Sequence, residues 1–149
     1  MNTDESLKLK GAMTAVLTKA DGTVETRYKD NIIVNVGFDF ISDAIGKSAA
    51  RPAVMSHIAI GTGSAAADVV QTALITEIAR IAAAYSHTAG TKVLTFAATF
   101  PAGTGTGPIT EAGVLNAASA GIMLDRVVFA VINKGSLDTL QVTFTFTMA

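Results

Sequence analysis

The chain has 149 residues, carries a formal net charge of −1 and contains no cysteine. Its length is that of one domain, which we expect to span residues 1–149. Without a basic excess, nucleic acid is not an expected partner, and without cysteine there are no disulfides, thiolate nucleophiles or sulfur-ligated metals. Only 15% of the residues are charged, against about 25% in a typical globular protein. Either small neutral side chains coat the surface of a simple soluble domain, or other proteins cover it, and we favour burial in an assembly.

The start of the chain is polar and acidic and has no hydrophobic periodicity. Residues 1–7 therefore predict a flexible N-terminal arm. The acidic start differs from the basic start of a signal peptide, and no apolar run approaches the roughly 18 residues of a membrane-spanning helix. We expect a protein made in the cytoplasm, with no membrane partner.

The first half of the chain predicts strands interrupted by one helix. Asp21-Gly22 is a strong hairpin signal between two strand-like runs. Phe38, Ile41 and Ile45 fall at helical spacing, which predicts a short amphipathic helix over 37–46. The segment 65–78 is ambiguous, being either a turn or two of helix or an irregular strap across a sheet. The expected strands of this half cover residues 7–18, 24–29, 32–34 and 55–60.

The second half predicts only strands and turns. The last strand has the clearest two-residue period, because apolar residues from Leu140 to Phe146 alternate with Gln and Thr. The expected strands cover residues 80–86, 92–100, 109–115, 124–132 and 138–148. About eight short strands at regular spacing indicate a mainly β protein: an antiparallel, jelly-roll-like β-sandwich with one or two short helices.

Two glycine-rich loops invite a nucleotide-binding interpretation. Residues 61–66 match the G-x-G-x-x-A form of a dinucleotide fingerprint, but the acidic residue expected about twenty positions later is absent. We interpret this stretch as a turn whose glycines need positive φ. The loop 101–108 lacks the lysine and following helix of a phosphate loop. We interpret it as a mobile surface loop that can dock on a neighbouring subunit through Thr104 and Thr106.

The ionisable residues give little support to catalysis. His57 and His87 lack the spacing of metal ligands, and no G-x-S-x-G motif is present. We expect no enzyme activity, no metal and no cofactor.

Glu77 and Glu111 stand in apolar surroundings, where a buried carboxylate needs a partner. Arg80 or Arg126 can supply it. We expect structural ion pairs here rather than a general acid/base pair, since ion pairs also perturb carboxylates.

The segment Leu7-Lys8-Leu9-Lys10 alternates apolar and basic residues. It has two interpretations of equal weight. It is either a strand added to a neighbouring subunit or an edge strand whose lysines prevent aggregation. These four residues are candidate contacts with a capsid or a neighbouring copy.

Two regions of the sequence resemble small structural proteins of tailed bacteriophages, such as capsid cement or decoration proteins. The resemblance covers most of residues 57–149 and is carried by turn and strand motifs. These motifs are His57-Ile58-Ala59-Ile60-Gly61-Thr62-Gly63, Thr72-Ala73-Leu74-Ile75-Thr76-Glu77 with Arg80, Ile109-Thr110-Glu111-Ala112-Gly113-Val114-Leu115-Asn116, Met123-Leu124-Asp125-Arg126-Val127-Val128-Phe129, and Ile132-Asn133-Lys134-Gly135 with the threonine-rich last strand.

The resemblance implies a β-sandwich or jelly-roll protein of the virion, on the capsid surface. Its implied partners are the major capsid protein, whose adjacent subunits it cements, and itself in a dimer or trimer. The family offers no catalytic residues to carry over. A tail- or baseplate-associated structural or adhesive module is the alternative. A carbohydrate-binding module is disfavoured because the chain has no Trp and two Tyr, a thin supply of stacking platforms.

Overall fold

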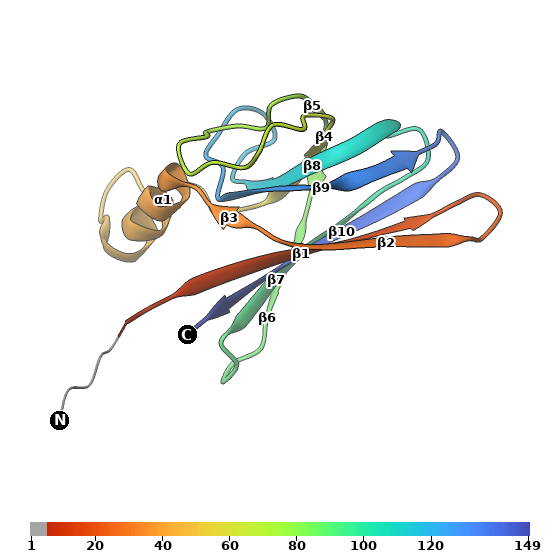
Figure 1. The fold of residues 1–149 in the computed structure, drawn as a ribbon. Coiled ribbons are helices and arrows are strands. Elements are labelled where there is room, and N and C mark those ends of the chain that lie inside the picture. The colour runs from red at the N-terminus through yellow and green to blue at the C-terminus, as the bar shows by residue number, and fades with distance from the viewer. Residues whose placement is uncertain (1–5) are drawn as a thin grey trace.

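The computed structural model describes residues 6–149. Two five-stranded antiparallel sheets pack face to face as a sandwich (Figure 1). The first sheet has the order β2 (Val24–Asp30), β1 (Leu9–Thr18), β10 (Thr139–Met148), β7 (Val93–Phe100) and β6 (Ala84–His87). The second has the order β3 (Ile32–Ile33), β9 (Asp125–Lys134), β8 (Gly107–Leu115), β4 (His57–Gly61) and β5 (Glu77–Ala82). The predicted mainly β sandwich is confirmed.

The core lies between the sheets and follows the two-residue period of the strands. In β10, Leu140, Val142, Phe144 and Phe146 are all buried, as their alternation predicts. The neighbouring strand β1 contributes a matching row of three buried residues, Met13, Ala15 and Leu17. Successive side chains of a strand point to opposite faces, so these rows form the inner face of the first sheet.

The chain passes directly from one sheet to the other at both edges of the sandwich. At one edge it leaves β2 and enters β3 through Asn31, and at the other it leaves β5 and enters β6 through Ala83. The single strand predicted over 80–86 is therefore wrong, because its two halves belong to different sheets. The small side chains around Ala83 permit this corner, and the Ala83 N–H donates to the carbonyl of Ser56 at 2.8 Å. The second sheet thereby holds the chain at the bend.

One helix, α1 (Asn35–Gly46), lies at one end of the sandwich and confirms the predicted helix, with an earlier start (Figure 1). Gly37 is its buried residue and lies directly against the backbone of Leu124. A side chain at position 37 would collide with that backbone, so the glycine permits the close approach. Phe38 and Ile45 remain largely exposed.

The segment 62–76 is an irregular strap across the outer face of the second sheet, which settles the choice left open by the sequence. Ala59 points to this outer face, since its neighbours Ile58 and Ile60 belong to the main core. A second small core is buried there by Val34, Ala59, Leu74, Leu115 and Met123. The strap thus gives the second sheet two buried faces.

Candidate functional site

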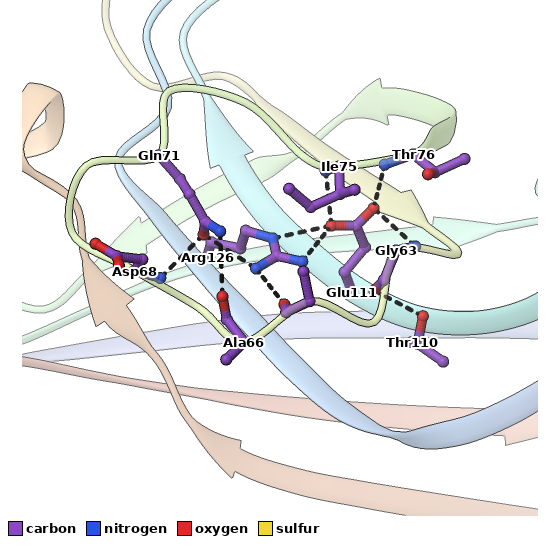
Figure 2. A network of polar contacts seen from close by, with 10 residues as sticks. Gly63, Ala66, Asp68, Gln71, Ile75, Thr76, Thr110, Glu111 and Arg126 are labelled. Atoms are coloured by element: carbon purple, nitrogen blue, oxygen red, sulfur yellow. Dashed lines mark hydrogen bonds and ion pairs between the residues drawn. The ribbon is translucent and has the colours of Figure 1, made fainter.

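A buried ion pair joins the middle of the second sheet to the strap (Figure 2). Glu111 of β8 and Arg126 of β9 are both fully buried, and the Nη2 atom of Arg126 lies 2.8 Å from Oε2 of Glu111. The Nε atom of Arg126 donates to the same oxygen at 2.9 Å. The sequence left open whether Arg80 or Arg126 is the partner of each carboxylate; the structure pairs Glu111 with Arg126, and this pair is the buried one.

The remaining hydrogen-bonding capacity of Glu111 goes to the strap backbone. Its carboxylate accepts the N–H groups of Gly63 at 3.0 Å, Ile75 at 3.0 Å and Thr76 at 2.7 Å. These three donors come from both ends of the strap, so one carboxylate closes it (Figure 2). A buried carboxylate is tolerated only with such partners. We therefore interpret Glu111 as a structural group that fixes the strap.

Arg126 binds the middle of the strap through hydrogen bonds. Its Nη1 atom donates to the carbonyl of Ala65 at 2.8 Å and to Oε1 of Gln71 at 3.0 Å. Gln71 in turn donates to the carbonyl of Ala66 at 3.1 Å and accepts the Asp68 N–H at 3.0 Å (Figure 2). This network is internal to the chain, and a fork-shaped guanidinium suits it because its donors point in fixed directions.

The glycines of the 61–66 motif leave space for the Glu111 carboxylate. A Cβ atom on Gly63 would lie 2.6 Å from Oε1 of Glu111 and 2.5 Å from Cβ of Ile75. Neither Gly61 nor Gly63 has positive φ, so the conformational reason inferred from the sequence is wrong. These positions need glycine because the Glu111 side chain and the strap approach their backbone too closely for a Cβ atom.

The Gly63→Ala substitution is expected to cost about 1–3 kcal/mol of unfolding free energy, because overpacking displaces the carboxylate or Ile75. Gly46 offers a matched control. A Cβ atom there meets nothing within 4 Å, so Gly46→Ala is expected to be neutral or to stabilise by up to about 1 kcal/mol. Urea unfolding of both variants measures the difference, and equal stabilities would contradict this role for Gly63.

The second expected ion pair, Glu77 with Arg80, lies at the edge of the second sheet on β5. Nη2 of Arg80 lies 2.6 Å from Oε1 of Glu77, and Nε lies 3.0 Å from Oε2. Nη1 of Arg80 also donates to the carbonyls of Ala117 at 2.9 Å and Ala120 at 2.8 Å. Arg80 therefore ties the edge strand to the turn between β8 and β9.

A further carboxyl, on Asp125 of β9, is buried beside the corner between β2 and β3. It accepts the N–H of Val114 at 3.1 Å and a hydrogen bond from Nδ2 of Asn31. Burial raises the pKa of Asp125 to about 8, and the two hydrogen bonds only partly oppose this rise. Sequence reasoning missed this group. The sequence feature that could have revealed Asp125 is the one that indicated Glu111, namely an acidic residue inside an apolar strand.

Lys134 of β9 is also buried and also escaped prediction. Its Nζ atom donates to the carbonyl of Pro101 at 2.9 Å. Burial lowers the pKa of Lys134, and the nearby Asp138 opposes this shift. The glycine-rich loop is thus anchored at its base, where the Gly103 N–H also donates to the carbonyl of Ser136 at 2.8 Å.

The two histidines do not meet. His57 lies on β4 and contacts Ser56 through Nδ1 at 2.8 Å, whereas His87 ends β6 and contacts the carbonyl of Val93 at 2.7 Å. Among residues 6–149, no cluster of three or more His, Asp or Glu side chains is arranged to hold a metal ion. No helix of this described part is long and apolar enough to cross a membrane.

The candidate contact residues from the sequence lie at opposite ends of the sandwich. Leu9 and Lys10 begin β1 and pair with the end of β10, and Leu7 and Lys8 precede them. Thr104 and Thr106 follow β7 at the far end, near the turn between β9 and β10. These two groups cannot form one contact patch. Residues 1–5 of the predicted arm lie outside the described residues, and the predicted contacts remain predictions.

An apolar cleft opens between the sheets at the α1 end. It has a volume of about 660 Å³. Large apolar side chains on its rim are strongly exposed: Leu7 by 74%, Phe38 by 50%, Val54 by 76% and Tyr85 by 62%. Its lining includes Leu9, Phe40, Ile41, Met55, Phe96 and Phe146. A contiguous exposed apolar surface of this kind marks an interaction site. We therefore take this end as the candidate functional surface.

No family model, no curated protein and no solved structure matches this chain.

Proposed function

We propose that this protein is a structural component of a tailed-phage virion. In this role it binds the outside of the capsid and cements adjacent major capsid protein subunits, itself forming a dimer or trimer. The sequence resemblance suggests the role. The observation that carries the proposal is the exposed apolar rim around the cleft at the α1 end.

The physical basis is burial of that rim against another protein. Fully burying one large apolar side chain contributes about 1.5–3 kcal/mol, so the rim supplies several such contributions before the cost of association. Repeating the contact over a lattice strengthens attachment further through multivalency. A small sandwich with a fixed strap loses little conformational entropy on binding, which favours such a role.

A head-binding experiment tests the proposal. Heads of the encoding phage that lack this protein are mixed with purified protein, and bound density is located by cryo-electron microscopy. We expect density on the outer capsid surface, bridging adjacent capsid subunits. Density confined to the tail or baseplate would instead support the alternative role there, and no density on the particle would contradict both.

Matched aspartate variants test the role of the rim. Val54→Asp places a charge on the rim and is expected to weaken head binding by about tenfold or more, the effect of losing one well-buried contact. Val24, which is 61% exposed at the other end of the sandwich, provides the control variant Val24→Asp. Equal binding of both variants would exclude the cleft end as the contact surface.

A further inference from the structure

The start of β1 has a strand on one side only. β2 pairs with β1 from Ala12 to Thr18 and then leaves for the second sheet. The last bond between them runs from the N–H of Asn31 to the carbonyl of Gly11 at 3.0 Å. β1 continues to Leu9 along β10 alone. In Figure 1 this part of β1 diverges from the chain that leads through β3 into α1.

The backbone of Leu7 and Leu9 faces the open side. Lys8 exchanges both backbone bonds with Ala149, at 2.6 and 2.8 Å. In an antiparallel ladder, successive residues turn their N–H and C=O groups to alternate sides. The groups of Lys8 and Lys10 therefore point toward β10, and those of Leu7 and Leu9 point away from it. Such an edge is a template for an additional strand.

A hollow lies where the missing strand would run. It has a volume of about 850 Å³ and lies between Leu9, Lys10 and Gly11 on one side and Ile33 and Phe38 on the other. It extends over the outer face of the first sheet, where Thr14, Tyr28, Thr145 and Thr147 line it. Leu9 and Phe38 also line the apolar cleft, so the two hollows adjoin each other at these residues. A strand at this edge would direct alternate side chains into the cleft, which is the arrangement of β-strand addition.

The charged side chains at this edge of β1 indicate which kind of strand can bind there. Lys8 and Lys10 lie on the outer face, since Leu9 between them packs against the core. Opposite charges directly across two strands are stabilising, and like charges are destabilising. A second copy pairing by this same edge, with Leu9 opposite Leu9, would set Lys8 of one copy opposite Lys10 of the other. The other charged side chain of the hollow, Asp30, lies opposite Ala12, where β2 ends.

We propose that the open edge of β1 at residues 7–11 receives one extended strand from a different protein subunit. Its apolar side chains enter the cleft, and acidic side chains between them face Lys8 and Lys10. This deepens the proposed function, because it names how a neighbouring subunit is held. In this proposal the segment Leu7-Lys8-Leu9-Lys10 accepts a strand, whereas one of its two interpretations from the sequence has it added as a strand to a neighbouring subunit.

Two capped peptides test the proposal on the full-length protein. One alternates valine with glutamate and the other alternates valine with lysine. By fluorescence anisotropy we expect the glutamate peptide to bind about tenfold more tightly, from two cross-strand pairs of the favourable sign. Hydrogen exchange should show new protection at the amides of Leu7 and Leu9. Equal affinities, or protection elsewhere in the chain, would overturn the proposal.

Charge reversal at the edge sharpens the test. The double variant Lys8→Glu with Lys10→Glu is expected to reverse the preference between the two peptides. It should bind the lysine peptide about tenfold more tightly than the glutamate peptide. Lys19→Glu, just past the far end of the same strand, is the control and should keep the original preference. A separate variant, Leu7→Pro, removes one donor on the open side and should weaken binding of the glutamate peptide. An unchanged affinity would argue against strand addition.

Failure of this proposal can be distinguished from failure of the proposed function. If wild-type protein binds phage heads but the peptides do not protect Leu7 and Leu9, strand addition is wrong and the virion role stands. If the peptides bind as expected but heads do not, the edge is an acceptor and the virion role is wrong. A dimer in sedimentation that Leu7→Pro abolishes would show that a second copy occupies the edge, which contradicts the occupant proposed here.

Discussion

Replacing Glu111 by alanine is expected to lower the free energy of unfolding by about 3–5 kcal/mol, the usual cost of breaking a buried ion pair from one side. The substitution leaves the fully buried guanidinium of Arg126 without a counter-charge. It also removes the acceptor of three strap N–H groups, those of Gly63, Ile75 and Thr76. Urea unfolding followed by circular dichroism measures the loss. Hydrogen exchange should report it first in the strap, which the carboxylate closes.

A partly exposed ion pair provides the control. Nη2 of Arg27 lies 2.6 Å from Oε1 of Glu25, and both side chains are partly exposed to solvent. Glu25→Ala is therefore expected to cost at most about 1 kcal/mol, because water screens such a pair. If Glu111→Ala costs no more than Glu25→Ala, burial does not make Glu111 important and the interpretation of the strap is wrong.

A double variant tests how much of this cost comes from the stranded charge. Combining Glu111→Ala with Arg126→Met removes the stranded charge but still leaves the strap N–H groups without their acceptor. It also removes the hydrogen bonds that Arg126 donates to Ala65 and Gln71. We expect it to be more stable than Glu111→Ala alone and less stable than the wild type. Replacing both members of a buried ion pair costs less than removing one member and leaving the other charge unpaired. A double variant as unstable as the single one would mean that removing the stranded charge gains no more than the loss of the two Arg126 hydrogen bonds costs.

The parts of the fold that depend on local pattern were predictable. The alternation in β10 gives its buried face directly, because the side-chain period of a strand is two. The same reasoning indicated that Glu111 needs a basic partner, with Arg80 or Arg126 as candidates, because a buried carboxylate without a partner is costly. The path of the strap was not predictable, because side chains distant in sequence decide it. Glu111 binds donors from 35 to 48 positions away.

The candidate surface was beyond sequence reasoning for a related reason. The cleft is lined by α1, by the loop before β4 and by residues of β1, β6, β7 and β10, which are far apart in the sequence. Each element has an ordinary pattern on its own, and only their arrangement brings Leu7 and Phe38 to the lining of one cleft. The low proportion of charged residues indicated that part of the surface is covered by other proteins. Composition does not indicate which part of the surface that is. The threonines of the glycine-rich loop were placed by motif alone and lie at the other end.

The stability of the wild type is expected to fall, relative to that of the Asp125→Asn variant, as the pH rises from about 4 to about 8. Burial raises the pKa of Asp125 from 3.8 to about 8 in the folded protein. Between these values the folded protein keeps a proton that the unfolded chain has lost, so unfolding releases it. The free energy of unfolding then decreases with pH, by up to about tenfold in the unfolding equilibrium constant per pH unit.

Asparagine at position 125 is the appropriate comparison because it preserves the shape and does not titrate. Its Oδ1 atom can still accept the N–H of Val114, as the carboxyl does at 3.1 Å. Its amide can also meet Asn31, whose Oδ1 atom is buried without a hydrogen-bond partner. The other titrating groups are common to both proteins, so the difference between the two stability curves isolates Asp125.

Urea unfolding of both proteins at a series of pH values gives that difference directly. We expect the two curves to converge toward pH 4, to separate through the window in favour of the variant, and to run parallel above about pH 8, where Asp125 is ionised in both states. The sign is opposite to that of a salt-bridged carboxylate, whose stabilisation is lost as the pH falls. Curves that stay parallel from pH 4 to 8 would mean that Asp125 ionises normally when folded. In that case the corner between β2 and β3 would have to admit enough water to solvate the carboxylate, and the packing of Asn31 against Gly11 would be looser than the structure places it.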